Sequence, residues 1–292
     1  MKVNNILLRT LLLATTTIGF AQSPVSGFMN KKGKGAIAVS YSSEKYNEVY
    51  LIPTKVDQVP VFNDVVNTAL NIYATYAITD KLEAMVSLPY IESKGNASAA
   101  TITAIGVENK RVGLQDVSAF IKYKVFSNRM TASTLDLMLS AGVQTPVGSY
   151  KADEGLQSII AIGNQGTKGM GLAIAQIKLD QGLFLSGQIG YRISTNQVPD
   201  AVVSEIKVGY AVSKFYFDAW AAFQKSSKGV DILQPGFTLF FPATTVNYSR
   251  IGANLYAPIY KGFGANFGVN AYVAGRNLGK SAGYSASLVY NY

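Results

Sequence analysis

The chain has 292 residues, among which 27 are Gly, 18 are Tyr and 14 are Phe, whereas only 15% are charged. It contains no histidine and no cysteine, which excludes Cys nucleophiles, Ser-His triads, disulfides and nearly all zinc or haem sites. This composition is poor for a helical enzyme and typical of many strands and turns. We therefore expect an all-β protein that is not an enzyme and that carries no metal ion or other cofactor.

The formal net charge is +9. The basic residues are scattered along the chain and are not clustered with a recognition motif, so we expect no nucleic-acid partner. The excess of positive charge fits attraction to anionic lipopolysaccharide, and it also fits basic loops that are simply solvated.

The first residues have the layout of a secretory signal peptide. Lys2 and Arg9 lead into the apolar run 11–20, and small residues flank a cleavage site. We expect a signal peptide over residues 1–21 and a mature domain over residues 22–292. The mature part has no cysteine for lipid attachment, and its longest uncharged stretch is interrupted by Pro and polar residues, so no helical anchor is expected. An exported chain of this kind is either soluble beyond the inner membrane or a membrane barrel.

Alternation of apolar and polar residues predicts strands from residue 35 onward. The clearest run is Val117 to Val125, where apolar side chains occupy every second position, and positions two apart share one face of a strand. The basic, Gly-containing stretch 31–34 is interpreted as a lead-in to the first strand. The same pattern predicts strands over 35–48, 66–78, 81–93, two strands within 112–146, then 170–179, 183–193, 201–212, 215–224, 245–257, 263–273 and 283–292.

The connections between these strands alternate between long and short. The short turns lie around residues 79–80, 127–130, 180–182, 213–214 and 260–262, with longer connections between them. An even number of strands, with both termini and all short turns on one side, is the arrangement of outer-membrane barrels, which have short periplasmic turns and long extracellular loops. The strands also reach the roughly 9 to 11 residues that a tilted membrane strand needs, whereas soluble strands peak near about 5 to 6. We predict a transmembrane antiparallel up-and-down β-barrel of about 12 strands.

In such a barrel the apolar face of each strand points to lipid and the polar face to the lumen. A slip of one residue in the fourth strand would place Lys122 and Lys124 in the membrane, at a cost of roughly 2 to 4 kcal/mol each at mid-bilayer. The candidate lumen-lining residues are the inward ones: Glu83, Asp116, Phe120, Lys122, Lys124, Asp136, Lys178, Arg192, Glu205, Lys207, Asp218, Trp220, Arg250 and Tyr272. Their mixed charges fit a salt-bridged, hydrated interior, which serves stability as readily as transport.

The size of the barrel indicates a narrow or obstructed bore. About 8 strands leave an interior filled by side chains and about 16 to 18 leave an aqueous channel, and twelve lie between. Two apolar segments within long loops, 156–162 and 236–241, are the candidates for obstruction. The candidate plug residues are Ile159, Ile160, Ile162, Phe237, Phe240 and Phe241. We predict that at least one of the two segments packs into the barrel mouth.

Several short motifs resemble those of a known family. The stretch 112–118, Val-Gly-Leu-Gln-Asp-Val-Ser, and the stretch 144–148, Gln-Thr-Pro-Val-Gly, are similar to the Gly-Leu-Gly-Asp and Pro-Thr-Gly elements of the outer-membrane barrel family named for phenol meta-pathway degradation. Gln115 stands where that family usually has Gly, and Val147 stands where it usually has Thr. The hairpin at 78–90 also looks similar. The resemblance covers most of the mature chain and implies an outer-membrane protein that admits hydrophobic or aromatic compounds, with no established catalytic residues.

The function that these features favour is an outer-membrane channel or transporter for small solutes, with hydrophobic and aromatic compounds as candidates. We expect it in the outer membrane of a Gram-negative bacterium, in contact with outer-membrane lipid and lipopolysaccharide, after insertion by the barrel-insertion machinery. Two alternatives stay open. One is a barrel with a structural or adhesive role and no transport, and the other is a secreted soluble β-protein that binds glycans.

Overall fold

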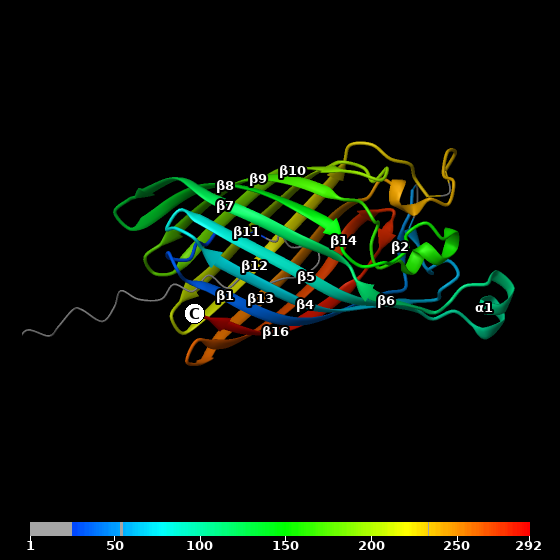
Figure 1. The fold of residues 1–292 in the computed structure, drawn as a ribbon, viewed down its shortest axis with the longest axis horizontal. Coiled ribbons are helices and arrows are strands. Elements are labelled where there is room, and N and C mark those ends of the chain that lie inside the picture. The colour runs from blue at the N-terminus through cyan, green and yellow to red at the C-terminus, as the bar shows by residue number, and fades with distance from the viewer. Residues whose placement is uncertain (1–24, 53–54, 233) are drawn as a thin grey trace, which may run out of the picture.

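The computed structural model describes residues 25–52, 55–232 and 234–292. The expected signal peptide, residues 1–21, lies outside the described residues. Long antiparallel strands, tilted to a common axis, form a barrel (Figure 1). They are β1 (Gly35–Tyr46), β4 (Val65–Ala77), β5 (Leu82–Gly95), β7 (Asp116–Arg129), β8 (Ser133–Pro146), β9 (Lys168–Leu179), β10 (Leu183–Ser194), β11 (Ala201–Val212), β12 (Phe215–Ser226), β13 (Asn247–Tyr260), β14 (Phe263–Arg276) and β16 (Ala282–Asn291).

The barrel is closed by its first and last strands. Each long strand pairs antiparallel with the next one in the chain, and β1 also pairs with β16 in a register that runs from Ala36 opposite Asn291 to Lys45 opposite Ala282. Closure leaves no long strand with an unpaired edge, which is the condition for a sheet to span a membrane. The predicted twelve-stranded antiparallel up-and-down barrel is confirmed.

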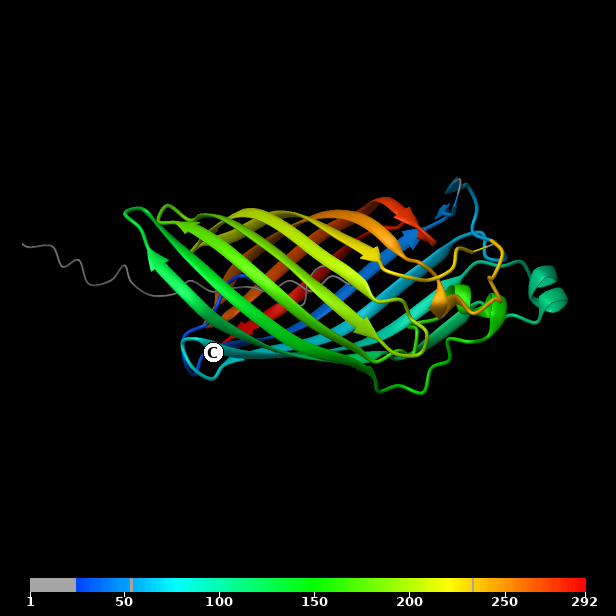
Figure 2. The same ribbon diagram turned by 90° about the horizontal axis from the view of Figure 1, so that it is seen from above.

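The two ends of the barrel differ. The tight turns 78–81, 130–132, 180–182, 213–214 and 261–262 gather at the end where β1 begins and β16 ends, which we call the short-turn end (Figure 2). The longer connections gather at the opposite, long-loop end. They carry elements that the sequence did not predict: β2 (Val49–Tyr50), β3 (Lys55–Val56), α1 (Ala99–Ile105), β6 (Lys110–Leu114), η1 (Gly155–Ile160), η2 (Phe241–Ala243) and β15 (Leu278–Gly279). Within the described ranges, none of the helices has the length and apolar character needed to cross a membrane.

The two faces of the barrel wall have opposite character. Along β7, Ile121 is 55% exposed on the outside, whereas the next residue, Lys122, is 0% exposed on the inside. The same contrast separates Leu139 from Ser140 on β8. A wall that exposes its apolar side chains and buries its ions is the reverse of a soluble protein and matches a lipid-facing barrel.

Strands β13 and β14 extend beyond their predicted ends at 257 and 273. A register shift between Ser249 and Arg250, and a second between Pro258 and Tyr260, interrupt the alternation near the strand ends. A bulge adds one residue to one strand, and Pro is tolerated there because no ladder hydrogen bond is required. The broken alternation explains why the sequence pattern placed the strand ends too early.

Candidate functional site: the barrel lumen and its closures

The half of the lumen near the short-turn end contains an apolar cluster. Its wall is made of inward side chains from the strands, and two residues that precede β1, Val25 and Phe28, pack among them. The wall residues are Ala36, Ala38, Tyr73, Met85, Phe120, Met138, Leu172, Ile174, Phe184, Ala211, Tyr216, Tyr256 and Val289. The centre of this half is therefore occupied by a chain segment that is not part of the wall.

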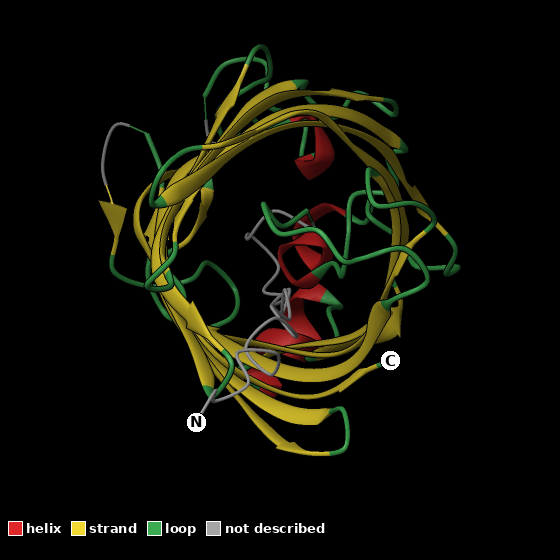
Figure 3. Ribbon diagram, turned by 90° about the vertical axis from the view of Figure 1, so that its left-hand side faces the viewer, coloured by secondary structure: helices red, strands yellow, loops and turns green. Residues whose placement is uncertain are grey.

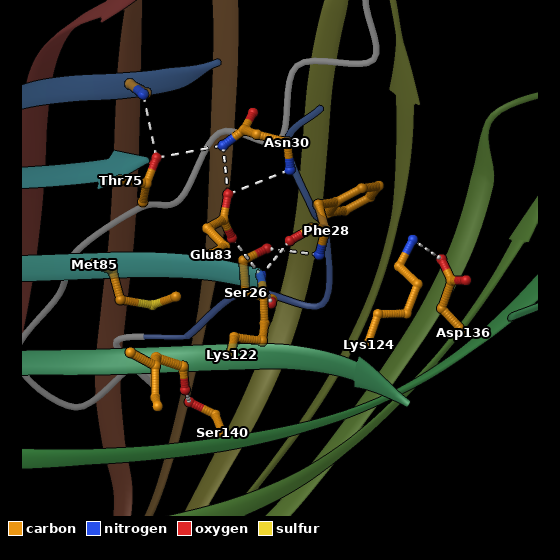
Figure 4. A network of polar contacts seen from close by, with 12 residues as sticks. Ser26, Phe28, Asn30, Thr75, Glu83, Met85, Lys122, Lys124, Asp136 and Ser140 are labelled. Carbon is orange, nitrogen blue, oxygen red and sulfur yellow. Dashed lines mark hydrogen bonds and ion pairs between the residues drawn. The ribbon is translucent and has the colours of Figure 1, made fainter. Parts of the chain in front are cut away.

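That segment, residues 25–34, enters the barrel at the short-turn end. The backbone nitrogen of Gly33 donates to the carbonyl oxygen of Ala77 (2.8 Å), and that of Lys32 donates to Asp80 Oδ1 (2.9 Å), which fixes the segment at the rim. Deeper inside, Asn30 Nδ2 donates to Glu83 Oε1 (2.6 Å) (Figure 4). The sequence interpretation of 31–34 as a lead-in to the first strand missed this inward path. We call residues 25–34 the N-terminal strap.

Phe28 of the strap lies in an aromatic socket. Its ring meets the ring of Phe184 edge-on with centroids 4.9 Å apart, and the ring of Tyr216 at 6.0 Å. Phe184 and Tyr216 stack on each other at 5.5 Å, and the ammonium of Lys178 lies 5.8 Å from the centre of the Phe28 ring. Edge-on aromatic pairs and a nearby cation are favourable arrangements for a ring. The socket is therefore a site that holds one small aromatic group.

A buried ion pair holds the backbone of the strap. Lys122 Nζ lies 2.8 Å from Glu83 Oε2, and both side chains are almost fully buried. The same ammonium donates hydrogen bonds to the carbonyl oxygens of Ser26 (2.8 Å) and Phe28 (Figure 4). A buried ion pair is tolerated only when further hydrogen bonds satisfy its remaining donors and acceptors. The strap supplies these partners, so the strap and the ion pair depend on each other.

The predicted lumen residues all come from the inner face of the wall, and most of the ions are paired. Nearer the long-loop end, Asp116 with Lys168 (3.0 Å) and Arg250 with Glu44 form buried pairs. The remaining pairs are Lys124 with Asp136, and Lys207 with Glu205 and Asp218. Trp220 and Tyr272 flank the guanidinium of Arg250, with ring centres 5.9 and 4.8 Å from it.

Asp116 also attaches the loop 147–167 to the wall. It accepts hydrogen bonds from the hydroxyl of Tyr150 in that loop, from Gln144 Nε2 (3.2 Å) and from Lys168 Nζ (3.0 Å). Burial and the contact with Asp116 raise the pKa of the Tyr150 hydroxyl above its ordinary value, so this hydroxyl stays protonated and donates at neutral pH.

Loops cover the long-loop end of the lumen, and helical turns are seen within the ring of strands in the axial view (Figure 3). In the loop 147–167, Ile160 is completely buried and Ile162 packs against Ala69 and Ile91 of the inner wall. Ile159 is half-buried in the same region. In the loop 227–246, the rings of Phe237 and Phe241 pack edge-on at 5.2 Å, and Phe240 is half-buried beside them.

Among the described residues, two of the cavities lie between these loops and the wall. One of about 280 Å³ lies beside Ile162 and is lined by Ser42, Glu44, Asn67 and Ile91 from the strands. The other, of about 370 Å³, is lined by Lys168, Arg192, Gln224, Tyr248, Phe241 and Pro242, among others. Gln115, Ala161 and Tyr272 border both cavities. We call the larger one the vestibule cavity.

No protein-family model matches the chain, and no curated protein matches its sequence. Among solved structures, the COG4313 outer membrane channel from Pseudomonas putida F1 superimposes with a TM-score of 0.71 at 12% identity, over 95% of this chain and 100% of that chain. The fold is that of an outer-membrane β-barrel. Two further structures match at lower TM-scores: a KdgM porin (0.48, 6% identity, 87% of this chain and 99% of that one) and outer membrane phospholipase A from Escherichia coli (0.43, 9% identity, 87% and 92%).

Within this outer-membrane barrel fold, the sequence pattern identified inward positions but not the two features that give the lumen its form. It did not identify the strap, because residues 25–34 show no strand alternation. It also did not identify the vestibule cavity, since that cavity is bordered by strand ends and by loops that are far apart in sequence. Phe28, the one aromatic residue between residues 25 and 34, was a signal for the strap that the sequence carried.

Proposed function

We propose that this protein is a gated outer-membrane channel for small solutes, with hydrophobic and aromatic compounds as candidates. The observation that carries the proposal is that separate chain segments obstruct the lumen. In barrels of about 8 strands the side chains of the wall themselves fill the interior. In this larger barrel the obstruction is the strap at one end and loops at the other, and these segments can move while the strand pairing of the wall stays intact.

The apolar half of the lumen supports an apolar or aromatic solute. Phe28 occupies the socket of Phe184 and Tyr216 as a phenyl group held by its own chain. If the strap leaves, the socket offers the same edge-on contacts to the ring of a solute. The strap is then both a gate and an occupant of a solute site. The solved structure that superimposes best among those given above is an outer membrane channel, in agreement with this assignment.

The proposal is tested by planar-bilayer recording on the purified full-length protein. A channel gives discrete current steps in KCl above the lipid background, and an aromatic solute such as benzyl alcohol, added to one side, interrupts that current when it enters the lumen. Removal of residues 25–30 from the mature chain increases the current, because it empties the apolar half. Absence of current from both the full-length protein and the shortened protein would reject a channel.

A structural or adhesive barrel is the second candidate. The loops at the long-loop end have a hydrophobic core of their own, in which Val59, Phe62, Val65 and Ile160 are buried. A preformed loop surface of this kind suits binding to another molecule. The same recordings discriminate the two candidates, because an adhesive barrel gives no solute-dependent current.

The proposed location is the outer membrane of a Gram-negative bacterium, with lipid and lipopolysaccharide as neighbours and insertion by the barrel-insertion machinery. The exposed apolar belt of the wall supports it, since large side chains such as Ile189 and Leu255 otherwise face water. Fractionation of cells is the test, and recovery in the culture supernatant without detergent would favour the soluble, glycan-binding alternative. We propose no catalytic activity, because the chain lacks histidine and cysteine.

A further inference from the structure

The vestibule cavity contains a half-buried cation, Arg192, that forms no ion pair with any carboxylate of the described residues. Arg192 lines this cavity near the end of β10. Its Nη1 donates to Gln224 Oε1 (3.0 Å), and its Nε is buried and has no hydrogen-bond partner. Across the described ranges, no carboxylate lies within ion-pair distance of its guanidinium. A charged group in this position costs free energy unless water or an anion approaches it.

The three cations of the lumen that are almost fully buried are each paired with a carboxylate, unlike Arg192. Lys122 pairs with Glu83, Lys168 with Asp116, and Arg250 with Glu44. The cavity therefore has one positive charge, on Arg192, that no side chain neutralises.

The nearby carboxylates are engaged by other donors. Asp116 accepts from Tyr150, Gln144 and Lys168. Asp200, which follows β10, accepts from the backbone nitrogen of Ser194 (2.8 Å). These contacts hold both acids in place, so neither is free to move to the guanidinium.

The rest of the lining indicates what kind of anion the cavity fits. The amide side chains of Gln144, Asn164 and Gln224 stand around the cavity and can donate to oxygen atoms, whereas the hydroxyl of Ser226 already donates to the carbonyl oxygen of Val246. Apolar and aromatic groups complete it: Val198, Pro199, Phe241, Pro242, Tyr248 and Tyr272. A volume of about 370 Å³ lies in the range of sites that bind small molecules.

We infer that the vestibule cavity binds small organic anions, monocarboxylates with an apolar or aromatic body, through Arg192. The guanidinium donates to the carboxylate, because its planar fork matches two carboxylate oxygens. The body of the solute lies against Tyr248, Phe241 and Pro242. This inference deepens the proposed channel function, on which it rests, by naming the solute class that enters from the long-loop end.

The test is calorimetric titration of the purified full-length protein in detergent at pH 7. Benzoate is the probe, and benzamide, which has nearly the same shape and no charge, is the matched solute. Acetate tests the need for an apolar body. The variants are Arg192→Gln, which removes the charge, and Arg192→Lys, which keeps it. Arg129→Gln is the control, because Arg129 pairs with Asp180 at the opposite end of the barrel.

We expect wild-type protein to bind benzoate at least about tenfold more tightly than benzamide, since a hydrogen bond to a charged group is the stronger kind. Arg192→Gln weakens benzoate binding by about 10- to 100-fold and leaves benzamide binding unchanged. Arg192→Lys keeps part of the preference, and Arg129→Gln keeps all of it. Acetate binds more weakly than benzoate because it lacks the ring.

Equal binding of benzoate and benzamide by the wild type would overturn the inference, as would no benzoate binding at all. Equal benzoate affinity of Arg192→Gln and the wild type would also overturn it. If Arg192→Gln does not fold, as judged by its heat-modifiable migration on gels, the wild-type comparison and Arg192→Lys decide. Planar-bilayer current is measured separately. Benzoate binding without any current would reject the channel and keep the site, whereas current without a benzoate preference would keep the channel and reject the site.

Discussion

Replacement of Phe28 by Ala should open the short-turn end of the lumen. The side chain is only 7% exposed, and its ring makes aromatic contacts with Phe184 and Tyr216. Burial of a Phe side chain contributes about 1.5 to 3 kcal/mol, and each aromatic pair adds about 0.5 to 1.5 kcal/mol. Taking the lower ends, the substitution removes about 2.5 kcal/mol from the seated state of the strap, which raises the ratio of unseated to seated strap by between ten- and a hundredfold.

Single-channel recording of Phe28→Ala in planar bilayers measures this change. The expected result is a higher open probability or a larger conductance than in the wild type. Phe217→Ala is the matched control, because Phe217 follows Tyr216 directly but faces the outside of the barrel. Phe28→Leu, which keeps burial and loses the aromatic contacts, should lie between the two. If Phe28→Ala and Phe217→Ala both conduct like the wild type, the strap is not the gate.

Three further predictions concern the wall and the loops. Lys122→Met leaves Glu83 buried without its partner, so the unfolding free energy in denaturant should fall by about 3 to 5 kcal/mol, and adding Glu83→Gln should recover much of it. Ile121→Lys, on the outer face at the middle of β7, should weaken folding into lipid vesicles by about 2 to 4 kcal/mol relative to Ile121→Leu. Hydrogen bonds from Lys280 and Lys55 lower the pKa of Glu48 to about 2. Its stabilising contribution should therefore be complete above the ordinary carboxylate range and be lost progressively as the pH falls from that range to about 2, which an NMR titration of the carboxylate would follow.

The strands could be predicted because apolar and polar residues alternate along them, so that one face of each strand suits lipid and the other suits the lumen. An outward Ile121 next to an inward Lys122 has one consistent solution in a membrane, since reversing the faces would place the ammonium in hydrocarbon. This rule fixed the strand number, the closed topology and the facing of the wall. It lost accuracy only where bulges break the period, as at Ser249 and Pro258.

Elements of the loops follow local signals that strand periodicity does not report. α1 has a serine cap, in which Ser98 Oγ accepts from the backbone nitrogen of Thr101 (3.1 Å), and it ends at Gly106 with φ of 73°. Ser at an N-cap and Gly just past a helix end are recognisable in a sequence. The β-branched residues between them oppose a helix, which explains why this segment was interpreted as a loop.

The ion pairs between charged side chains across the lumen could not be derived from the sequence, because they depend on the strand register and the curvature of the whole barrel. Arg250 on β13 lies beside Glu44 on β1, which is 206 residues away in the sequence. The two residues come together because β1 pairs with β16, and β16 pairs with β14, the neighbour of β13. The alternation rule tells which charges point inward. It does not tell which of them lack a partner among the described residues, and in this respect Arg192 differs from Arg250.

The two ends of the lumen differ in the side chains that they offer to a solute. A solute that enters from the long-loop end first meets a cation, Arg192, in a cavity with polar and aromatic walls. Farther along, it meets an apolar half in which Phe28 already fills the aromatic socket. In the proposed channel, the site for the charged head and the site for the ring therefore lie in series, with the strap at the exit. An aromatic carboxylate satisfies both in turn, whereas an inorganic anion gains nothing from the socket and a neutral hydrocarbon gains nothing from Arg192. Selectivity in this arrangement requires the closed strap, so Phe28→Ala should admit acetate and benzoate at more nearly equal rates than the wild type does.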